Sequence, residues 1–323
     1  VAEIADKIVV MQNGQIVETA KTEVLLYNMK HPYTRALFNA STHRVVMPDV
    51  ITSGTLLSVD SVVRTYSLPR NGVLGSRPNF NALDNVSFNI SHGERVGLVG
   101  ESGCGKSTLT RAILGVEDVQ SGWIKLDGEP VFSGKRPNID VRRKMQVVFQ
   151  DPYSSFNPRH RVDRLIAEPL HVLENPPVGK LKDLAILKAL EDVGLMGSDA
   201  KKFIHEFSGG QRQRIAIARA LIIEPELIIF DEAVSALDVS VRAQVLDLIA
   251  ELCHKRPLAY LFISHDLSVV RTVTDRVMIM RAGKIVEHGE TEKVFTNPQN
   301  AYTKTLIAAA PRLPEITYAI EPV

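Results

Sequence analysis

Residues 100–107 constrain the fold of this chain more than any other segment. They read Gly-Glu-Ser-Gly-Cys-Gly-Lys-Ser and fit the pattern G-x-x-x-x-G-K-[ST], directly after the strand-like run 94–99. Glycines let backbone N–H groups turn inward around phosphate oxygens, and the N-terminus of a following helix adds a favourable positive potential. We therefore predict a strand, a phosphate-binding loop and then an amphipathic helix from Thr108 to about Leu114.

Individual positions of this loop have expected roles. Lys106 should reach the β- and γ-phosphates of a nucleotide, and the hydroxyl of Ser107 should ligate Mg²⁺. Cys104 occupies a free position, where its thiol is either inert or made reactive because Lys106 and the helix terminus lower its pKa. The predicted nucleotide-binding residues of this segment are Gly100, Glu101, Ser102, Gly103, Cys104, Gly105, Lys106, Ser107 and Thr108.

A second apolar run, 227–230, ends in two carboxylates. Its sequence, Leu-Ile-Ile-Phe, is typical of a buried parallel strand, and Asp231 and Glu232 follow it. Ligands of α/β sheets bind at the carboxyl ends of the strands. We expect Asp231 to hold Mg²⁺ directly or through water, and Glu232 to be the general base that polarises the attacking water. Capping of a helix is the alternative role for both acids.

Residues 207–214 predict a second anion-binding helix start. Ser208 is a natural N-cap, and Gly209 and Gly210 allow close approach of a ligand to the backbone. The run Ser208-Gly209-Gly210-Gln211 resembles the LSGGQ signature of ABC ATPases, with Phe207 in place of the usual leucine. An Ala/Ile-rich helical run, 215–223, follows it.

Further motifs of ABC ATPases follow in the family's order. Gln150 resembles the glutamine of the Q-loop, residues 235–238 resemble the D-loop that ends in Asp238, and His265 resembles the switch histidine of the H-loop. Tyr66 lies where the family places an aromatic side chain that stacks on adenine. The resemblance covers roughly residues 56–311.

Each of these side chains also has a simpler interpretation. Tyr66 could be an ordinary strand aromatic, Gln150 a solvated loop amide and His265 a packed histidine. Ser264, His265 and Asp266 are not a catalytic triad, because adjacent side chains point apart. Asp266 is instead expected to cap the next helix.

The resemblance implies an α/β fold of the P-loop NTPase (RecA-like) type. A helical subdomain at about 151–206 is inserted into this core, and an antiparallel β subdomain accompanies it. The resemblance also implies a head-to-tail pair of nucleotide-binding domains, with ATP between Lys106 of one domain and Ser208 of the other, so that two helix termini face one γ-phosphate. The implied catalytic residues are Glu232, His265, Gln150 and Lys106, and the implied Mg²⁺ ligands are Ser107, Gln150 and Asp231.

The two ends of the chain resemble each other. Residues 4–40 align without gaps on residues 273–309, and both stretches read as strand, glycine turn, strand and helices. Chance similarity of two hairpins is the alternative to a duplication. The identical pairs include Asp6/Asp275, Met11/Met280, Gly14/Gly283, Ile16/Ile285, Val17/Val286, Glu18/Glu287, Tyr33/Tyr302, Thr34/Thr303 and Leu37/Leu306.

This repeat predicts the domain organisation. Residues 1–41 are expected to be the tail of a preceding ABC ATPase domain, and residues 42–55 a linker. Residues 56–290 should form the nucleotide-binding domain, and residues 291–323 a C-terminal extension of the peptide-importer type. Without the rest of its own domain, the first stretch is expected to be mobile or to pack non-natively.

Three segments narrow the resemblance within the family. Residues 150–159 are similar to the segment after the Q-loop in oligopeptide, dipeptide and nickel importer ATPases, and residues 294–303 to the extension of that group. Residues 231–238 read DEAVSALD, where most family members have DEPTSALD. This variant, together with the tandem layout, most resembles the fused glutathione-importer ATPases. The resemblance implies an ATPase that energises import of peptide-like solutes, with membrane-spanning permease subunits, a second nucleotide-binding domain and, indirectly, a periplasmic binding protein as partners.

Composition excludes several other classes. The net charge of +1 gives no reason to expect nucleic acid as a partner, and the two cysteines, Cys104 and Cys253, lack the spacing of zinc or iron–sulfur sites. No apolar run approaches the ~20 residues that span a bilayer, and residues 1–6 do not resemble a signal peptide. We therefore expect the chain to stay in the cytosol and to reach a membrane only through a partner, and the resemblance implies a peripheral place on the cytoplasmic face of a bacterial inner membrane.

Three alternative functions remain open on the sequence. A soluble tandem ABC ATPase acting on ribosomes would carry a long charged helical linker, which residues 42–55 do not resemble. A DNA-repair or chromosome ATPase of the same superfamily would show zinc cysteines or coiled-coil heptads. An exporter subunit would differ in its permeases and in the direction of transport.

Overall fold

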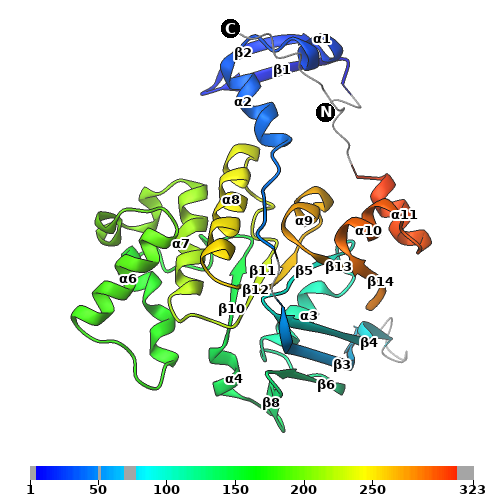
Figure 1. Ribbon diagram of the computed structural model, residues 1–323, viewed down its shortest axis with the longest axis vertical. Helices are drawn as coiled ribbons and strands as arrows, with labels where there is room; N and C mark the ends of the chain where they lie inside the picture. Colours follow the sequence, from blue (N-terminus) through cyan, green and yellow to red (C-terminus); the bar gives the residue numbers. More distant parts are fainter. Residues whose placement is uncertain (1–4, 50–51, 69–77, 311–323) are drawn as a thin grey trace, which may run out of the picture.

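The computed structural model describes residues 5–49, 52–68 and 78–310. Its centre is a six-stranded sheet in the order β10-β11-β12-β5-β13-β14, in which all neighbours are parallel except β13 and β14 (Figure 1). These strands are β5 (Arg95–Val99), β10 (Met145–Phe149), β11 (Leu227–Asp231), β12 (Ala259–Ile263), β13 (Arg276–Arg281) and β14 (Lys284–Glu290).

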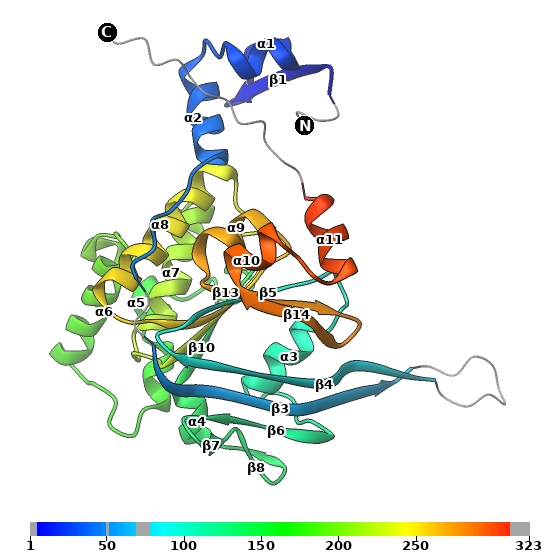
Figure 2. The same ribbon diagram turned by 45° about the vertical axis from the view of Figure 1, so that its right-hand side comes forward.

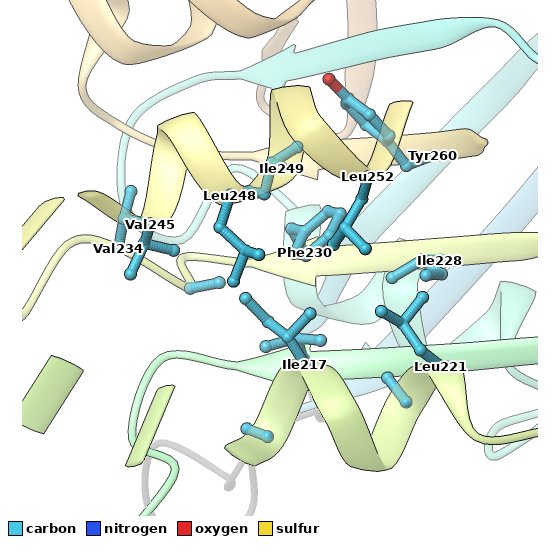
Figure 3. Packing of buried hydrophobic residues seen from close by; sticks show 14 of the residues in the cluster. Ile217, Leu221, Ile228, Phe230, Val234, Val245, Leu248, Ile249, Leu252 and Tyr260 are labelled. Carbon is cyan, nitrogen blue, oxygen red and sulfur yellow. The ribbon is translucent and has the colours of Figure 1, made fainter. Parts of the chain in front are cut away.

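Short apolar runs form the central strands because both faces of the sheet are covered. The side chains of β5 and β12 are buried along their whole length, as are those of residues 227–230 in β11. Figure 3 shows how two helices pack against the sheet: α7 (Gly209–Leu221) and α8 (Val239–Lys255) bring Ile217, Leu221, Leu248 and Leu252 toward Ile228 and Phe230 of β11.

An antiparallel sheet of four strands lies beside this core, in the order β4-β3-β6-β7 (Figure 2). This confirms the predicted antiparallel β subdomain. Its strands are β3 (Ser53–Ser67), β4 (Asn79–His92), β6 (Ser121–Leu126) and β7 (Glu129–Pro130), and a small hairpin of β8 (Phe132–Ser133) and β9 (Arg136–Pro137) follows.

Helical segments fill the region between β10 and β11, where the sequence predicts an inserted helical subdomain. They are α5 (Val162–Ile166), η1 (Glu168–Val172), α6 (Lys180–Asp192), η2 (Gly197–Lys201) and η3 (Ile204–Glu206). The remaining helices of the core are α3 (Lys106–Ile113), α4 (Ile139–Arg143), α9 (Leu267–Val273), α10 (Thr291–Thr296) and α11 (Ala301–Ala308). Among the helices of the described residues, none combines the length and the apolar character that crossing a bilayer requires.

Residues 7–41 form a small folded unit above α8 in Figure 1. It consists of β1 (Lys7–Gln12), β2 (Gln15–Lys21), α1 (Thr22–Tyr27) and α2 (Pro32–Ser41). Val10, Leu25 and Met29 are buried within it, so this unit has an apolar centre of its own. Helix α2 packs on α8.

The segment between this unit and β3 is shorter than predicted and is docked on the core. Strand β3 already begins at Ser53, so the expected linker 42–55 overlaps the sheet. His43 Nε2 lies 2.7 Å from Asp247 Oδ1 on α8, and the buried guanidinium of Arg95 donates to the carbonyl of Pro48 at 2.7 Å. Pairing with β4, which opposes His92 to Ser53 and Ser91 to Thr55, extends β3 upstream of the predicted boundary.

The two ends of the chain share local geometry as well as sequence. The hairpin β1–β2 has a bulge between Val10 and Met11, and β13–β14 has one at the matching place. The carboxylate of Glu18 accepts hydrogen bonds from the N–H groups of Lys30 and His31 at 2.8 and 3.1 Å, just before α2. Glu287 accepts the equivalent pair just before α11, at 2.7 and 3.1 Å. The repeat is therefore structural.

Candidate functional site

Four loops meet at one edge of the central sheet. Because β10, β11, β12 and β5 are parallel neighbours, their carboxyl ends lie together. Gln150 follows β10, Asp231 ends β11, Glu232 follows it, and His265 lies just after β12. The phosphate-binding loop follows β5, so this topology brings the predicted catalytic residues to one edge.

The phosphate-binding loop is shaped by close backbone approaches. A Cβ atom on Gly100 would lie 2.2 Å from the carbonyl oxygen of Met280, and one on Gly105 would lie 2.2 Å from that of Ala82. Gly105 also has φ +116°, which L side chains rarely adopt. This residue is the N-cap of α3, and the helix therefore begins at Lys106, two residues earlier than predicted.

The ammonium group of Lys106 is buried in the loop that it should serve. Its Nζ donates to the carbonyl oxygens of Gly100 at 2.7 Å and Glu101 at 3.0 Å. Ser107 follows Lys106 in the first turn of α3, and its side chain is exposed. Lys106 thus lies at the start of a helix whose N–H groups can face an anion.

Cys104 does not have the activated thiol that one of the two sequence interpretations allowed. The thiol is buried, and burial raises the pKa of Cys104 above its ordinary value. The positive charge of Lys106 opposes this effect without reversing it. The interpretation of Cys104 as a reactive residue is wrong, because desolvation of the thiolate outweighs the nearby cation.

Asp231 lies close enough to Glu232 and Lys106 for both charges to act on its carboxylate. Burial raises the pKa of Asp231 and the charge of Glu232 adds to this, whereas the charge of Lys106 acts in the opposite direction. Phe149 pairs with Asp231 at the end of the β10–β11 ladder. Gln150 and Glu232, the next residue of each strand, therefore lie at the same edge of the sheet. Neither acid caps a helix of the described chain.

Glu232 and His265 are direct neighbours. His265 Nδ1 lies 3.3 Å from Glu232 Oε2, and the histidine side chain is 61% exposed. Glu232 adopts a left-handed backbone conformation with φ +51°, and its N–H donates to the carbonyl of Ile263 at 2.9 Å. Such conformations of non-glycine residues are uncommon and concentrate at functional sites. His265 is not a packed core histidine.

The residues predicted to hold Mg²⁺ supply suitable ligands. Mg²⁺ binds oxygen, usually through one or two carboxylates together with phosphate oxygens. Ser107, Gln150 and Asp231 offer a hydroxyl, an amide and a carboxylate oxygen, and a cation would relieve the unfavourable burial of the Asp231 charge. In the described ranges, no group of three or more His, Cys, Asp or Glu side chains could hold a metal ion by itself.

Tyr66 is held by an acidic side chain that the sequence interpretation missed. Its hydroxyl donates to the carboxylate of Glu117, 2.7 and 2.8 Å from the two oxygens, and Arg64 binds the same carboxylate at 2.5 Å. The Arg64 guanidinium carbon also lies 5.0 Å from the centroid of the Tyr66 ring. Glu117 lies four residues after the end of α3, so its hydrogen bonds connect Tyr66 to the end of the helix that follows the phosphate-binding loop. Sequence spacing carries no signal for this contact.

The signature residues start a helix, as predicted, but lie apart from the phosphate-binding loop. Ser208 caps α7: its Oγ accepts from the N–H of Gln211 at 3.4 Å, and Gln211 Oε1 accepts from the N–H of Ser208 at 3.0 Å. Helix α7 lies away from α3 in both views (Figures 1 and 2). Within the described residues, no hydrogen bond or ion pair joins Ser208 or Gln211 to that loop.

The start of α8 lies beside the start of α7. A Cβ atom on Gly210 would lie 2.3 Å from Cγ1 of Val241, so a larger residue could not occupy this position without a shift. Asp238 caps α8 by accepting from the N–H of Val241 at 3.0 Å. A Cβ atom on Gly209 would meet no atom of the described residues within 4 Å, which leaves its side open. The two capped helix starts therefore form one face.

Asp266 caps α9, which confirms the prediction for this residue. Its carboxylate accepts from the N–H groups of Ser268 and Val269, and Arg242 of α8 binds the other oxygen at 2.6 Å. The carboxylate is thus fully engaged and does not act on His265 as in a catalytic triad.

Comparison with known proteins agrees with this geometry. Residues 83–235 match the family described as ABC transporter, and residues 17–46 and 286–321 both match the family described as oligopeptide/dipeptide transporter, C-terminal region. The second family thus matches both copies of the internal repeat.

Several curated proteins are similar over almost the whole chain. The glutathione import ATP-binding protein GsiA of Shigella dysenteriae is 42% identical over 96% of this chain and 54% of its own length. The uncharacterized ABC transporter ATP-binding protein YejF of Escherichia coli is 43% identical over 95% of this chain and 58% of its own length. The chain spans little more than half the length of these relatives.

Solved structures give the same result. The ATP-binding cassette MJ0796, solved as a dimer bound to ADP and Pi, is similar with a TM-score of 0.63 and 26% identity, covering 73% of this chain and 99% of that one. The protein cbiO1 from Clostridium perfringens is similar with a TM-score of 0.64 and 26% identity, covering 76% of this chain and 92% of that one. The chain therefore belongs to the ABC transporter family of ATP-binding proteins, in the group that carries the oligopeptide/dipeptide transporter C-terminal region.

Proposed function

We propose that this chain binds Mg-ATP at the edge of its central sheet and hydrolyses it to energise a transporter. The observation that carries the proposal is the approach of His265 to Glu232, at 3.3 Å, beside the loop that holds Lys106. A general base, a phosphate-binding loop and a nearby cation are the parts that phosphoryl transfer to water requires.

The chemistry follows from the position of each side chain. Lys106 must leave the carbonyls of Gly100 and Glu101 to bind the β- and γ-phosphates, and the N–H groups at the start of α3 bind the same oxygens. Glu232 then accepts a proton from the attacking water, while His265 orients the carboxylate through their contact. Mg²⁺, held by Ser107, Gln150 and Asp231, would neutralise charge on the phosphates.

A second nucleotide-binding domain would complete the site. The capped starts of α7 and α8 form an exposed face that no described contact connects to the chain's own phosphate-binding loop. In a head-to-tail pair, Ser208, Gly209 and Gln211 of one domain would face the γ-phosphate bound by Lys106 of the other. Tyr66 would contact the adenine, with Arg64 and Glu117 holding its hydroxyl.

The N-terminal unit is proposed to be the tail of another ATP-binding domain. Val9 and Met11 on β1 are 48% and 55% exposed, whereas the matching Met278 and Met280 on β13 are fully buried against the central sheet. Burial of such apolar side chains is favourable, so β1 would add to a sheet in the same way that β13 adds to β5. The greater length of the relatives supports this arrangement.

The transporter is proposed to be an importer of peptide-like solutes at the cytoplasmic face of a bacterial inner membrane. Its C-terminal region is of the oligopeptide/dipeptide transporter type, and the name of one relative states glutathione import. The partners would be permease subunits that span the membrane, with a periplasmic binding protein acting through them.

Replacing Lys106 by alanine tests this function. We expect hydrolysis of Mg-ATP to fall at least about 10²-fold, because a cation that stabilises the transition state is lost. Cells that depend on the protein should lose uptake of labelled glutathione or short peptides with this variant. Lys182→Ala, on the exposed side of α6, is the control. Wild-type hydrolysis by Lys106→Ala would contradict the assigned site, and unchanged uptake of both solutes in cells without the protein would contradict the importer.

A further inference from the structure

Tyr302 connects the C-terminal extension to the phosphate-binding loop. It is the second residue of α11 and is 7% exposed. Its hydroxyl oxygen accepts a hydrogen bond from the N–H of Glu101 at 3.2 Å. Burial raises the pKa of Tyr302, so the phenol stays protonated at neutral pH. A residue near the end of the described chain thus contacts the loop that should bind phosphate.

The contacted peptide is the one on which Lys106 rests. In the peptide bond between Gly100 and Glu101, the N–H of Glu101 donates to Tyr302, and the carbonyl of Gly100 accepts from Lys106 Nζ at 2.7 Å. Movement of Lys106 toward a phosphate breaks the second contact and leaves the first in place. Tyr302 therefore holds Glu101 independently of where the lysine lies.

The extension and the β13–β14 turn hold the loop at two points. The N–H of Gly283, in this turn, donates to the carbonyl of Cys104 at 2.9 Å. Arg281, at the end of β13, lies over the Tyr302 ring, with 4.7 Å between its guanidinium carbon and the ring centroid. Cation–π contacts of this kind help to fix the position of a ring.

The N-terminal copy of the repeat has the same backbone cap before its matching tyrosine. The N–H of Tyr302 donates to the Asn300 side chain at 2.9 Å, and the N–H of Tyr33 donates to the His31 ring at 3.2 Å. The backbone at both tyrosines is therefore held by the same kind of cap at the start of a helix. This cap fixes the place where Tyr302 enters α11 without any contact to the phosphate-binding loop.

We propose that Tyr302 is a positioning residue of the nucleotide site. Its hydroxyl fixes the first peptide of the phosphate-binding loop, so that the affinity for nucleotide depends on the C-terminal extension. This inference rests on the proposed function, because it assigns the loop to ATP. A preorganised loop loses less conformational freedom when it binds phosphate.

The test is the variant Tyr302→Phe, which removes the hydroxyl and keeps the ring that Arg281 contacts. The dissociation constant for Mg-ATP should rise roughly two- to tenfold, the effect of one hydrogen bond. The turnover rate at saturating ATP should stay within about twofold, because Tyr302 does not contact the reacting atoms. Tyr27→Phe, which removes an exposed hydroxyl on α1, is the matched control and should change neither quantity.

Each outcome separates this inference from the proposed function. Wild-type affinity in Tyr302→Phe would overturn the positioning role. A lower melting temperature without nucleotide, accompanied by equal losses of turnover and affinity, would show that the hydroxyl serves stability and would also overturn it. Failure of the wild-type chain to bind Mg-ATP would instead overturn the proposed function itself.

Discussion

Replacement of Glu232 by glutamine should lower ATP hydrolysis by about 10²–10⁴-fold, the range expected when a general base is removed. The amide has the same shape as the carboxylate but cannot accept the proton of the attacking water. Binding of Mg-ATP should persist, because Lys106 and the loop around it are unchanged. Steady-state hydrolysis and equilibrium binding of the same preparation measure the two effects.

Glu251→Gln is the control for this substitution, since Glu251 is exposed on α8 away from the sheet edge. It should hydrolyse ATP at the wild-type rate. Wild-type hydrolysis by Glu232→Gln would assign the base to another residue, and loss of ATP binding would show that Glu232 acts in binding rather than in chemistry.

A Cβ atom at Gly105 should lower both stability and nucleotide binding. In Gly105→Ala the new methyl would meet the backbone oxygen of Ala82 at 2.2 Å, and φ +116° is strained for alanine. We expect a loss of about 2–5 kcal/mol in the free energy of unfolding, from overpacking and backbone strain together. Displacement of the loop should also weaken Mg-ATP binding at least about tenfold, because the start of α3 moves.

Gly128→Ala separates the two causes. Gly128 has φ +80°, but a Cβ atom there would meet no described atom within 4 Å, so this variant should lose only about 1–2 kcal/mol and bind ATP normally. Urea unfolding and ATP titration of both variants provide the comparison. Equal stability of Gly105→Ala and the wild type would contradict the close approach to Ala82.

Much of the site could be predicted because short motifs carry it. Apolar strand runs end at Asp231 or just before Gly100, Gln150 and His265, which predicts parallel strands, and parallel strands place their carboxyl ends together. Helix caps can be predicted in the same way, since the residue type and position of Ser208 indicate the N-cap of a helix.

The missed features depend on contacts between distant segments or on backbone conformation. The left-handed conformation of Glu232 has no signature in the residue types around it. The hydrogen bonds of Tyr66 with Glu117, and of Glu101 with Tyr302, join residues far apart in sequence. The internal repeat does mark Tyr302 as identical to Tyr33, but identity within a repeat assigns no role to the side chain.

Boundaries were the least accurate predictions, for physical reasons. Helix α3 starts at Lys106 because Gly105 can adopt the left-handed N-cap conformation, which moves the start into the loop. Strand β3 begins at Ser53 because β4 offers it a partner. One interpretation of the sequence lets Lys106 and the helix terminus lower the pKa of Cys104, whereas burial of the thiol raises it.

The association state of the Glu232→Gln variant tests the central claim most directly. Sedimentation velocity with Mg-ATP should show a dimer that is absent without nucleotide, and Ser208→Arg in the same background should abolish it, because a large cation would occupy the facing anion site. A variant that binds Mg-ATP but sediments as a monomer, or dimerises equally with arginine at position 208, would contradict a nucleotide held between Lys106 of one domain and Ser208 of another.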